Sequence, residues 1–185
     1  MMIELVQKSE KYINQGHFGV EGKPETLTRQ FLIEPLLRLL GWSDDPAGRF
    51  YYVREFRGGM DRKWEDYVLL SEDRPLVFVE TKPLFDEKLL STRNVNELLN
   101  YMKEFNRKNR NGHRLDWGLL TNFREIHIFY VSRNKPFFSC DYNNYVEKIN
   151  LLKELISVDG IARAHARILF LPLFTRTTFS FQDIS

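Results

Sequence analysis

Cysteine and long hydrophobic runs are nearly absent from this sequence. The 185 residues include one cysteine, Cys140, so no internal disulfide bond can form. A lone thiol fits a reducing cytoplasm, and we expect Cys140 to be an inert packed side chain rather than a nucleophile. The longest apolar run near the end, Ile168 to Phe174, is far too short to cross a bilayer, and the first ten residues lack a signal-peptide centre. We therefore expect a cytoplasmic protein without a membrane partner.

Several well-known site motifs are missing as well. The sequence has no glycine-rich phosphate loop, no dinucleotide fingerprint and no serine nucleophile elbow. Its four histidines, at 17, 113, 127 and 165, do not have the spacing of zinc ligands. The net charge is only +2, and 28% charged with 43% hydrophobic residues is typical of a globular protein. A nucleic-acid partner therefore has to be judged from local charge clusters.

The most informative stretch is W-E-D-Y-V-L-L-S-E-D-R-P-L-V-F-V-E-T-K, from Trp64 to Lys82. Its two short apolar runs, separated by polar turn residues, predict an antiparallel hairpin. Because side chains of a strand alternate between faces, Glu80 and Lys82 should project to the same side. Asp66, at the start of the first strand, should lie beside them. Two carboxylates and an ammonium group are thus predicted to converge at one edge of an apolar sheet.

Charged groups beside a buried strand are costly unless they are paired or bind a metal. One interpretation is a plain salt bridge from Lys82 to Glu80 or Asp66. The other is a divalent-metal site, in which carboxylate oxygens hold magnesium and the lysine lies near a phosphate. Asp61 and Glu65 are rival carboxylates, but Asp66 is preferred because a strand holds it in a reproducible position.

Hydrophobic periodicity predicts the helices. Residues 3–15 form a short amphipathic helix, and a second begins at Pro24 and is capped at its end by Gly41. Pro35 should kink this second helix because it removes a backbone donor. A third helix spans 91–106. The expected buried faces are Leu27, Phe31, Leu36, Leu37 and Leu40 in the second helix, and Val95, Leu98, Leu99, Met102 and Phe105 in the third.

Strands are predicted at 49–56, at the hairpin, at 117–121 and at 126–131. A helix crossing between the hairpin and residues 117–121 implies a βαβ unit with a parallel strand pair. We therefore predict an α/β (α+β) fold with a central mixed sheet flanked by helices. One compact domain would contain an N-terminal helix and loop (1–23), a core (24–132) and a C-terminal helical extension and tail (133–185), with helices at 142–156 and 160–168.

Two acidic residues on the second predicted helix and a pair on the third also have alternative interpretations. Glu25 lies four residues before Arg29, and the simplest interpretation is an exposed ion pair; Glu34 is interpreted in the same way. Glu97 and Tyr101 are one turn apart beside the buried stripe and can face a common ligand. Alternatively, Tyr101 packs at the core boundary with its hydroxyl group in water.

A basic segment, K-E-F-N-R-K-N-R-N-G-H-R, follows the third helix. It can be a solvated loop. It is also the best candidate for phosphate contact, since arginine can bind phosphate oxygens in a bidentate manner. The candidate DNA-binding residues are Lys103, Arg107, Lys108, Arg110 and Arg114.

Asp66, thirteen further residues and then Glu80-Thr81-Lys82 resemble the D…(D/E)-x-K core of the PD-(D/E)XK nuclease superfamily. The flanking motifs are E-x-x-T-R-x-x-x-I-x-P-L-L-x-x-L-G-W (from Glu25), D-Y-V-L-L, V-F-V-E-T-K and W-G-L-L-T-N-F-R. Together they are similar to the N-terminal nuclease domain of type I restriction-enzyme R subunits and related single-chain restriction enzymes. The resemblance covers residues 24–131 in the same order.

The resemblance implies a restriction-endonuclease-like αβββαβ core and a role for each matching residue. Asp66 and Glu80 would bind Mg²⁺, for which Mn²⁺ can substitute, with the main-chain carbonyl of Thr81 as a further ligand. Lys82 would orient or help to deprotonate the attacking water. Glu25 corresponds to a first-helix glutamate near the metal.

The resemblance also implies that the helix after the lysine carries Gln-x-x-x-Tyr. Here Glu97 stands in the glutamine position and Tyr101 in the tyrosine position, while Glu65 stands where proline often precedes the aspartate. A carboxylate at position 97 would repel DNA unless it joins the metal site or a salt bridge.

The implied function is a metal-dependent endodeoxyribonuclease that cleaves double-stranded DNA within a restriction–modification system. Other restriction-enzyme domains or subunits are expected partners, and a homodimer would serve double-strand cleavage. The alternatives are a catalytically silent nuclease-fold module that binds DNA or a partner protein, and a structural domain whose charges form plain salt bridges.

Overall fold

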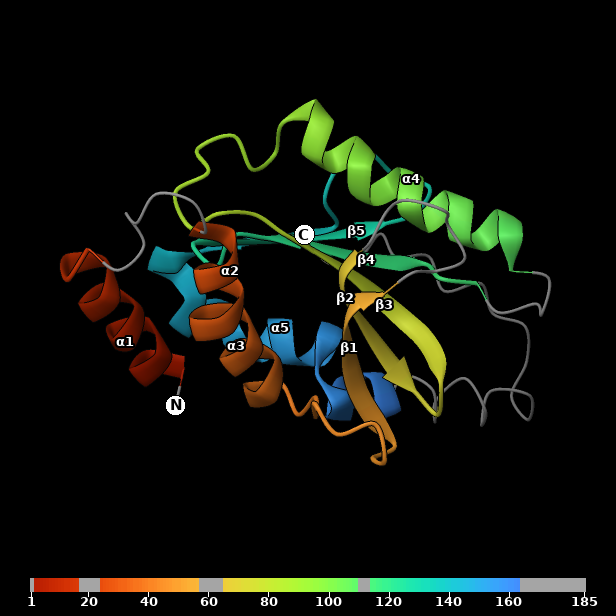
Figure 1. Cartoon of the computed structure of the whole chain (residues 1–185), viewed down its shortest axis with the longest axis horizontal. Helices are drawn as coiled ribbons and strands as arrows, with labels where there is room; N and C mark the ends of the chain where they lie inside the picture. Colours follow the sequence, from red (N-terminus) through yellow and green to blue (C-terminus); the bar gives the residue numbers. More distant parts are fainter. Residues whose placement is uncertain (1, 17–23, 57–64, 110–113, 164–185) are drawn as a thin grey trace.

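The computed structural model describes residues 2–16, 24–56, 65–109 and 114–163, and in them a mixed sheet lies between two layers of helices (Figure 1). Within these described ranges, six strands lie side by side in chain order, and β3 and β4 are the only neighbouring strands that pair in parallel. They are β1 (Phe50–Phe56), β2 (Glu65–Ser71), β3 (Arg74–Thr81), β4 (Trp117–Thr121), β5 (Glu125–Tyr130) and β6 (Phe138–Asp141).

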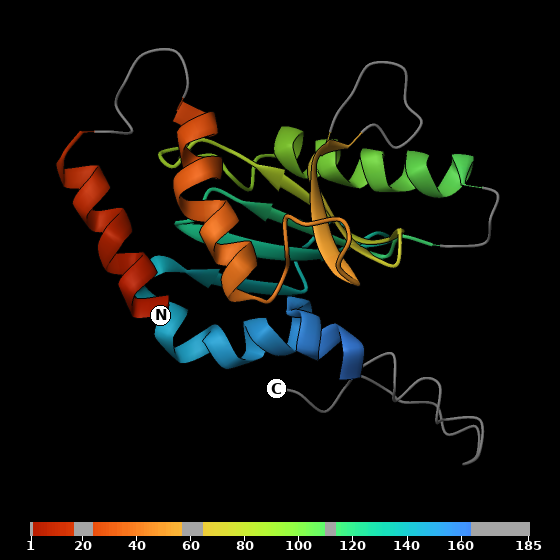
Figure 2. The same cartoon turned by 60° about the horizontal axis from the view of Figure 1, so that its bottom comes forward.

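One face of the sheet is covered by α4 (Thr92–Lys108), which crosses from β3 to β4 and makes their parallel pairing possible. The other face is covered by α1 (Met2–Asn14), by the segment α2 (Pro24–Thr28), η1 (Arg29–Ile33) and α3 (Glu34–Leu39), and by α5 (Tyr145–Ile156) (Figure 2). This order confirms the predicted αβββαβ core and the predicted mixed sheet flanked by helices.

The β2–β3 hairpin is confirmed, and its turn has a clear backbone cause. Glu72 and Asp73 have φ values of 50° and 63°, so both central residues are left-handed, as a tight two-residue hairpin turn requires. Pro75 lies where the register shifts beside Leu69 and Leu70, a place where a missing backbone donor is tolerated. The turn fixes the register that brings the start of β2 beside the end of β3.

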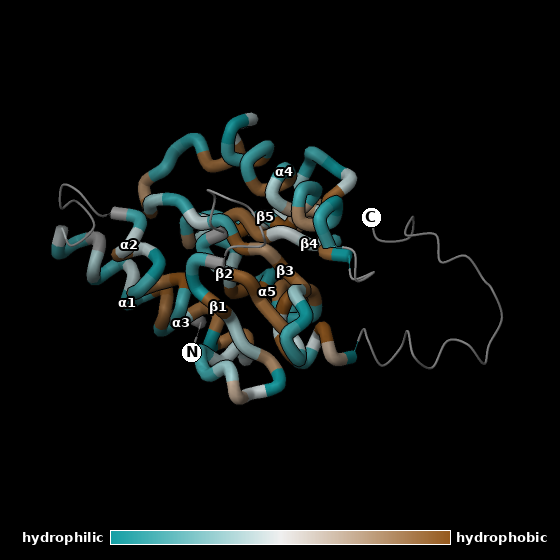
Figure 3. Tube along the Cα trace, turned by 45° about the vertical axis from the view of Figure 1, so that its right-hand side comes forward, coloured by the Kyte–Doolittle hydropathy of each residue, from teal (hydrophilic) through white to brown (hydrophobic). Residues whose placement is uncertain are grey.

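Alternating side chains of the central strands feed two separate cores. Hydrophobic stretches of the trace lie along the central strands (Figure 3). The core under α1, α3 and α5 takes Tyr67, Leu69, Val77 and Val79, and the core under α4 takes Val68, Leu70 and Phe78. Gly118 lets α4 approach β4 closely, because a Cβ atom there would lie 2.6 Å from the sulfur of Met102. The predicted buried stripe of α4 is confirmed.

The second helix departs from its predicted face. A π turn, η1, precedes Pro35, and the Glu34 N–H donates to the carbonyl of Arg29, five residues earlier. A wider turn rotates the residues around it relative to a uniform helical period. Phe31, predicted as buried, is therefore 36% exposed, and Leu32 and Ile33 are fully buried instead. The interruption expected at Pro35 takes the form of this wide turn.

The C-terminal part of the described chain adds to the same core. Strand β6, absent from the sequence prediction, pairs with β5 and leads through η2 (Tyr142–Asn144) into α5. One hydrophobic cluster joins Leu5 of α1 to Ile156 of α5, so this core does not divide at residue 24 or at residue 133. Residues 158–163 are helical, and the rest of the predicted 160–168 helix and the tail lie outside the described residues.

Cys140 is buried on β6, and burial raises the pKa of its thiol to about 12, as suits a packed and unreactive side chain. Among the described residues, no helix combines the length and apolar character needed to span a membrane.

Candidate functional site

The predicted charged residues meet where β2 begins and β3 ends. Asp66 is the second residue of β2, Glu80 and Thr81 end β3, and Lys82 follows directly. Antiparallel pairing places these two strand ends side by side. The α2–η1 segment approaches from one face of the sheet and α4 from the other, so three different parts of the chain contribute to one site.

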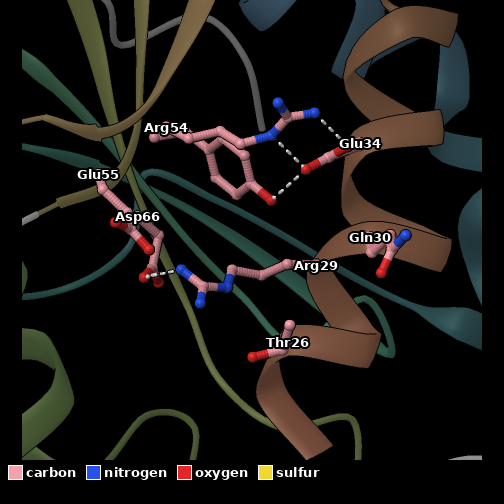
Figure 4. A pocket seen from close by; sticks show the side chains of 8 residues that line it. Thr26, Arg29, Gln30, Glu34, Arg54, Glu55 and Asp66 are labelled. Carbon is pink, nitrogen blue, oxygen red and sulfur yellow. Dashed lines mark hydrogen bonds and ion pairs between the residues drawn. The ribbon is translucent and has the colours of Figure 1, made fainter. Parts of the chain in front are cut away.

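Asp66 is held by three protein donors. Its Oδ2 accepts hydrogen bonds from the Thr81 backbone N–H at 2.7 Å and from the Thr81 hydroxyl group at 2.6 Å. Its Oδ1 accepts one from Arg29 Nη1 at 2.9 Å (Figure 4). The sequence interpretation of Arg29 as the partner of an exposed Glu25 is wrong, because Arg29 pairs with Asp66 and Glu25 is half-buried.

Glu80 and Lys82 point to the same side, as strand alternation predicts. The Lys82 Nζ donates to Glu80 Oε1 at 2.5 Å and to Glu97 Oε2 at 3.3 Å. Glu97 thus joins a salt bridge, which was one of the two arrangements that would keep its charge from facing DNA. The Tyr101 hydroxyl donates to Glu97 Oε1 at 3.1 Å, so the interpretation that this hydroxyl lies in water is wrong.

Burial and like charges make this site electrostatically unusual. Glu80 is only 6% exposed, and its burial, with the nearby Asp66 charge, raises the pKa of Glu80 to about 8 despite the Lys82 contact. Burial and Asp66 also raise the pKa of Glu25. Burial of the Lys82 ammonium group by itself lowers the pKa of Lys82, but the carboxylates of Glu80 and Glu97 outweigh this effect, and the pKa of Lys82 is raised. The site therefore carries more negative charge than its own cations neutralise.

A charge balance shows what this site would accept. The interacting groups are four carboxylates and two cations: Glu25, Asp66, Glu80 and Glu97, with Arg29 and Lys82. When all of them are ionised, the excess of two negative charges equals in size the charge of one divalent cation. Carboxylate oxygens are the ligands that Mg²⁺ prefers. The donor set thus fits a hard divalent cation.

The number of side chains that could bind one metal ion at this site is small. Within the described ranges, no three His, Cys, Asp or Glu side chains gather at distances suited to one metal ion. Asp66 and Glu80 would therefore supply two side-chain ligands, and main-chain or water oxygens would complete the coordination, as is common for Mg²⁺.

A pocket of about 380 Å³ opens beside Asp66, between the α2–η1–α3 segment and the strands β1 and β2. Its lining is mostly polar or charged: Thr26, Arg29, Gln30, Glu34, Arg54, Glu55, Asp66 and Tyr67. The exposed interpretation of Glu34 is wrong, because it is 7% exposed and both its oxygens bind Arg54 at 2.7 Å (Figure 4). The Tyr67 hydroxyl also donates to Glu34, at 3.2 Å.

The predicted DNA-binding cluster lies elsewhere. Lys103, Arg107 and Lys108 are in the last turns of α4, and Arg114 lies shortly before β4. The ten residues from Glu97 to Arg107 correspond to roughly 15 Å along a helix. Lys108 pairs with Glu104 at 3.1 Å, and Arg114 with Asp116 at 3.7 Å. The structure does not bring these basic side chains to the carboxylates of Asp66 and Glu80. Arg110 and the rival carboxylate Asp61 are outside the described residues.

No protein-family model matches the chain, and no curated protein matches it in sequence. Among solved structures, it is similar to the type IIG restriction endonuclease BpuSI, with 23% identity and a TM-score of 0.39 over 60% of this chain. It is also similar to a chain of the DrdV–DNA complex, with 16% identity and a TM-score of 0.44.

The two neighbours differ in how much of them the chain covers. It spans only 11% of the BpuSI chain, whereas the DrdV match covers 81% of this chain and 94% of that one. Both TM-scores lie below 0.5, so neither likeness by itself establishes family or activity.

Two contributions to the site are not predicted by the sequence patterns. The helical period relates Arg29 only to its neighbour Glu25, one turn earlier on the same helix face. Thr81 is predicted to contribute only its main-chain carbonyl, whereas its N–H and its hydroxyl group both hold Asp66. The T-R of the first motif and the T of V-F-V-E-T-K are the available signals.

Proposed function

We propose that this chain is a Mg²⁺-dependent endodeoxyribonuclease that hydrolyses phosphodiester bonds of double-stranded DNA, as the cleavage module of a restriction–modification system. The observation that supports it most is the meeting of Asp66 and Glu80 at adjacent strand ends, with Lys82 in contact with Glu80. In this proposal Mn²⁺ substitutes for Mg²⁺. Other restriction-enzyme domains, subunits or a second copy of the chain would complete the enzyme.

In the proposed mechanism, Asp66 and Glu80 hold the cation, with the main-chain carbonyl of Thr81 as a further oxygen ligand. When bound, Mg²⁺ would polarise the phosphoryl group and make its bound water more acidic. Lys82 lies on the Glu80 side of the site, where its ammonium group can orient the attacking water and stabilise the negative charge that develops on the phosphate.

The side chains of α4 support Lys82 in this role. Glu97 and Glu80 raise the pKa of Lys82, so its ammonium group is charged at neutral pH. Lys82 therefore acts by position and charge in this proposal, not by removing a proton. Tyr101 holds Glu97 through its hydroxyl group, and Glu97 in turn holds Lys82. Glu25, near Asp66, adds a further negative charge on the other side.

Cleavage of supercoiled plasmid DNA tests this function. The wild-type protein should nick or linearise plasmid in Mg²⁺ or Mn²⁺ and do neither in chelator. Asp66→Asn and Lys82→Ala should each lower the cleavage rate by about a hundredfold or more, because Asp66 would hold the cation and Lys82 would stabilise the charge that develops on the phosphate. Circular dichroism and urea unfolding would show that both variants are folded.

Glu72→Gln is the matched control. Glu72 is an exposed acidic residue in the turn at the opposite end of the same hairpin, and its loss should leave cleavage unchanged. Undiminished cleavage by folded Asp66→Asn or Lys82→Ala would contradict the proposed function.

A catalytically silent module that binds DNA or a partner protein is the second candidate. It is favoured by one observation: Asp66 accepts hydrogen bonds from three protein donors, so its charge is compensated without a cation. A titration with Mn²⁺ separates the two functions. The nuclease should show cation binding that Glu80→Gln abolishes, whereas a silent module should bind its partner with no cation effect dependent on Glu80.

A further inference from the structure

Of the three donors that hold Asp66, Arg29 is the one that can move away easily. The Thr81 N–H that binds Oδ2 belongs to a strand paired on both sides, and the Thr81 hydroxyl group lies on the same residue. Oδ1, by contrast, is bound by a long, flexible side chain from a helix, with Nη1 at 2.9 Å. Any change in how Asp66 is bound will therefore begin at Arg29.

A divalent cation and the Arg29 guanidinium group would repel each other if both bound Oδ1 of Asp66. Mg²⁺ binds oxygen at about 2.1 Å, so a cation on Oδ1 would lie within a few ångströms of the Arg29 charge. Like charges at that distance repel strongly in a half-buried site. The same charge of Arg29 partly neutralises Asp66 when no cation is bound.

The pocket beside Asp66 provides a place for a displaced Arg29 side chain. Arg29 already lines this pocket of about 380 Å³, so its guanidinium group need only swing within it. Glu55 lies on the same wall next to Asp66 (Figure 4) and is exposed, so it can receive the guanidinium group.

We infer that Arg29 is an internal counter-ion of Asp66 that competes with the divalent cation and moves into the adjoining pocket when the cation is held. There its guanidinium group pairs with the exposed carboxylate of Glu55. This inference rests on the proposed function, because it requires a cation at Asp66. The position of Arg29 then depends on whether Asp66 holds a cation.

Calorimetric titration with Mn²⁺ in the absence of DNA tests the competition. Arg29→Gln should bind Mn²⁺ about tenfold more tightly than the wild type, because the competing charge is gone. Arg38→Gln removes an equally positive side chain from the same helical segment, where it pairs with Asp44 and Glu34 rather than Asp66, and should change the affinity less than about twofold. Asp66→Asn should lose Mn²⁺ binding.

A second measurement follows the movement itself in the wild-type protein. The guanidinium N–H signals of Arg29, assigned by their absence from the spectrum of Arg29→Gln, should shift on addition of Mg²⁺, because Nη1 loses its hydrogen bond to Asp66 Oδ1. An unchanged signal under saturating Mg²⁺ would show that Arg29 stays on Asp66, and the inference would be overturned.

Cleavage kinetics give the third readout. In Arg29→Gln the cation concentration for half-maximal rate should fall about tenfold, because the competing positive charge is gone. If Arg29 only held Asp66 in place, its loss would weaken cation binding. Equal or weaker Mn²⁺ binding by folded Arg29→Gln therefore overturns the inference but leaves the proposed function standing. No Mn²⁺ binding by the wild type would overturn both.

Discussion

Glu80 shows most clearly how a single residue is altered by its surroundings. Its carboxyl group is buried at the end of β3, next to Asp66. Burial and the Asp66 charge raise the pKa of Glu80 to about 8, although Lys82 is in contact with it. Burial without sufficient positive charge is unfavourable for the ionised form. The ionised form of Glu80 is therefore destabilised in the folded protein, and its effect on stability has a defined sign.

The free energy of unfolding in chelator should fall as pH rises from about 5 to about 8. In this range the unfolded chain has released the Glu80 proton, because a solvated glutamate has a pKa of 4.5, while the folded protein still binds it. The native state therefore holds more protons than the unfolded state, and stability declines by up to about 1.4 kcal/mol per pH unit. Urea unfolding at several pH values measures this decline.

Glu80→Gln is the comparison for this pH dependence. The amide cannot ionise, so the variant should show a flatter profile and exceed the wild type in stability at pH 8 without cation. Parallel profiles for the two proteins would contradict the pH effect assigned to Glu80.

Among the elements, the α2–η1–α3 segment has the largest influence on the site. It carries Glu25 and Arg29, and its position on the sheet is fixed by Glu34, whose two oxygens bind the Arg54 guanidinium group of β1. The π turn lies between these two points of contact. A shift of this segment would therefore move Arg29 relative to Asp66 on β2.

Arg54→Met should lower the free energy of unfolding by about 1–3 kcal/mol, because it leaves the Glu34 carboxylate buried with less compensation. Glu34→Gln combined with Arg54→Met should recover part of this loss, since a neutral amide is cheaper to bury. Urea unfolding of the single and double variants forms a mutant cycle that measures the coupling. Additive losses would show that the ion pair does not hold the segment on the sheet.

At the scale of the whole molecule, the charge distribution separates two regions. The acidic site lies at the meeting of β2 and β3, and the basic residues lie at the far end of α4, partly paired with Glu104. A duplex bound at the site would have to extend along α4 to reach both. The overall charge of +2 is too small to draw DNA without such a local contact.

Replacing Arg107 and Lys108 by alanine should weaken binding to duplex DNA and reduce the slope of log affinity against log salt by up to about two. The Arg133→Ala and Lys135→Ala pair, on the loop between β5 and β6, removes the same charge and is the matched control. Fluorescence anisotropy at several salt concentrations measures both slopes. Equal losses for the two pairs would show that the α4 cluster has no special role in DNA contact.

The sequence by itself determined the elements whose signals are local. Alternation along β2 and β3, the turn at Glu72 and Asp73, and the buried stripe of α4 follow from the two-residue and 3.6-residue periods. These patterns are sufficient to place Asp66, Glu80 and Lys82 at one edge of the sheet. Their meeting needs only a hairpin register, which a short turn sets.

The tertiary structure alone decided which partners these residues take. Arg29 and Asp66 are separated by 37 residues, and Glu34 and Arg54 by 20, so no local pattern relates them. The π turn that exposes Phe31 and buries Leu32 likewise depends on how one helix packs on the sheet. A side chain with several charged groups within reach selects its partner by three-dimensional proximity and burial, and these arise only when distant segments pack together.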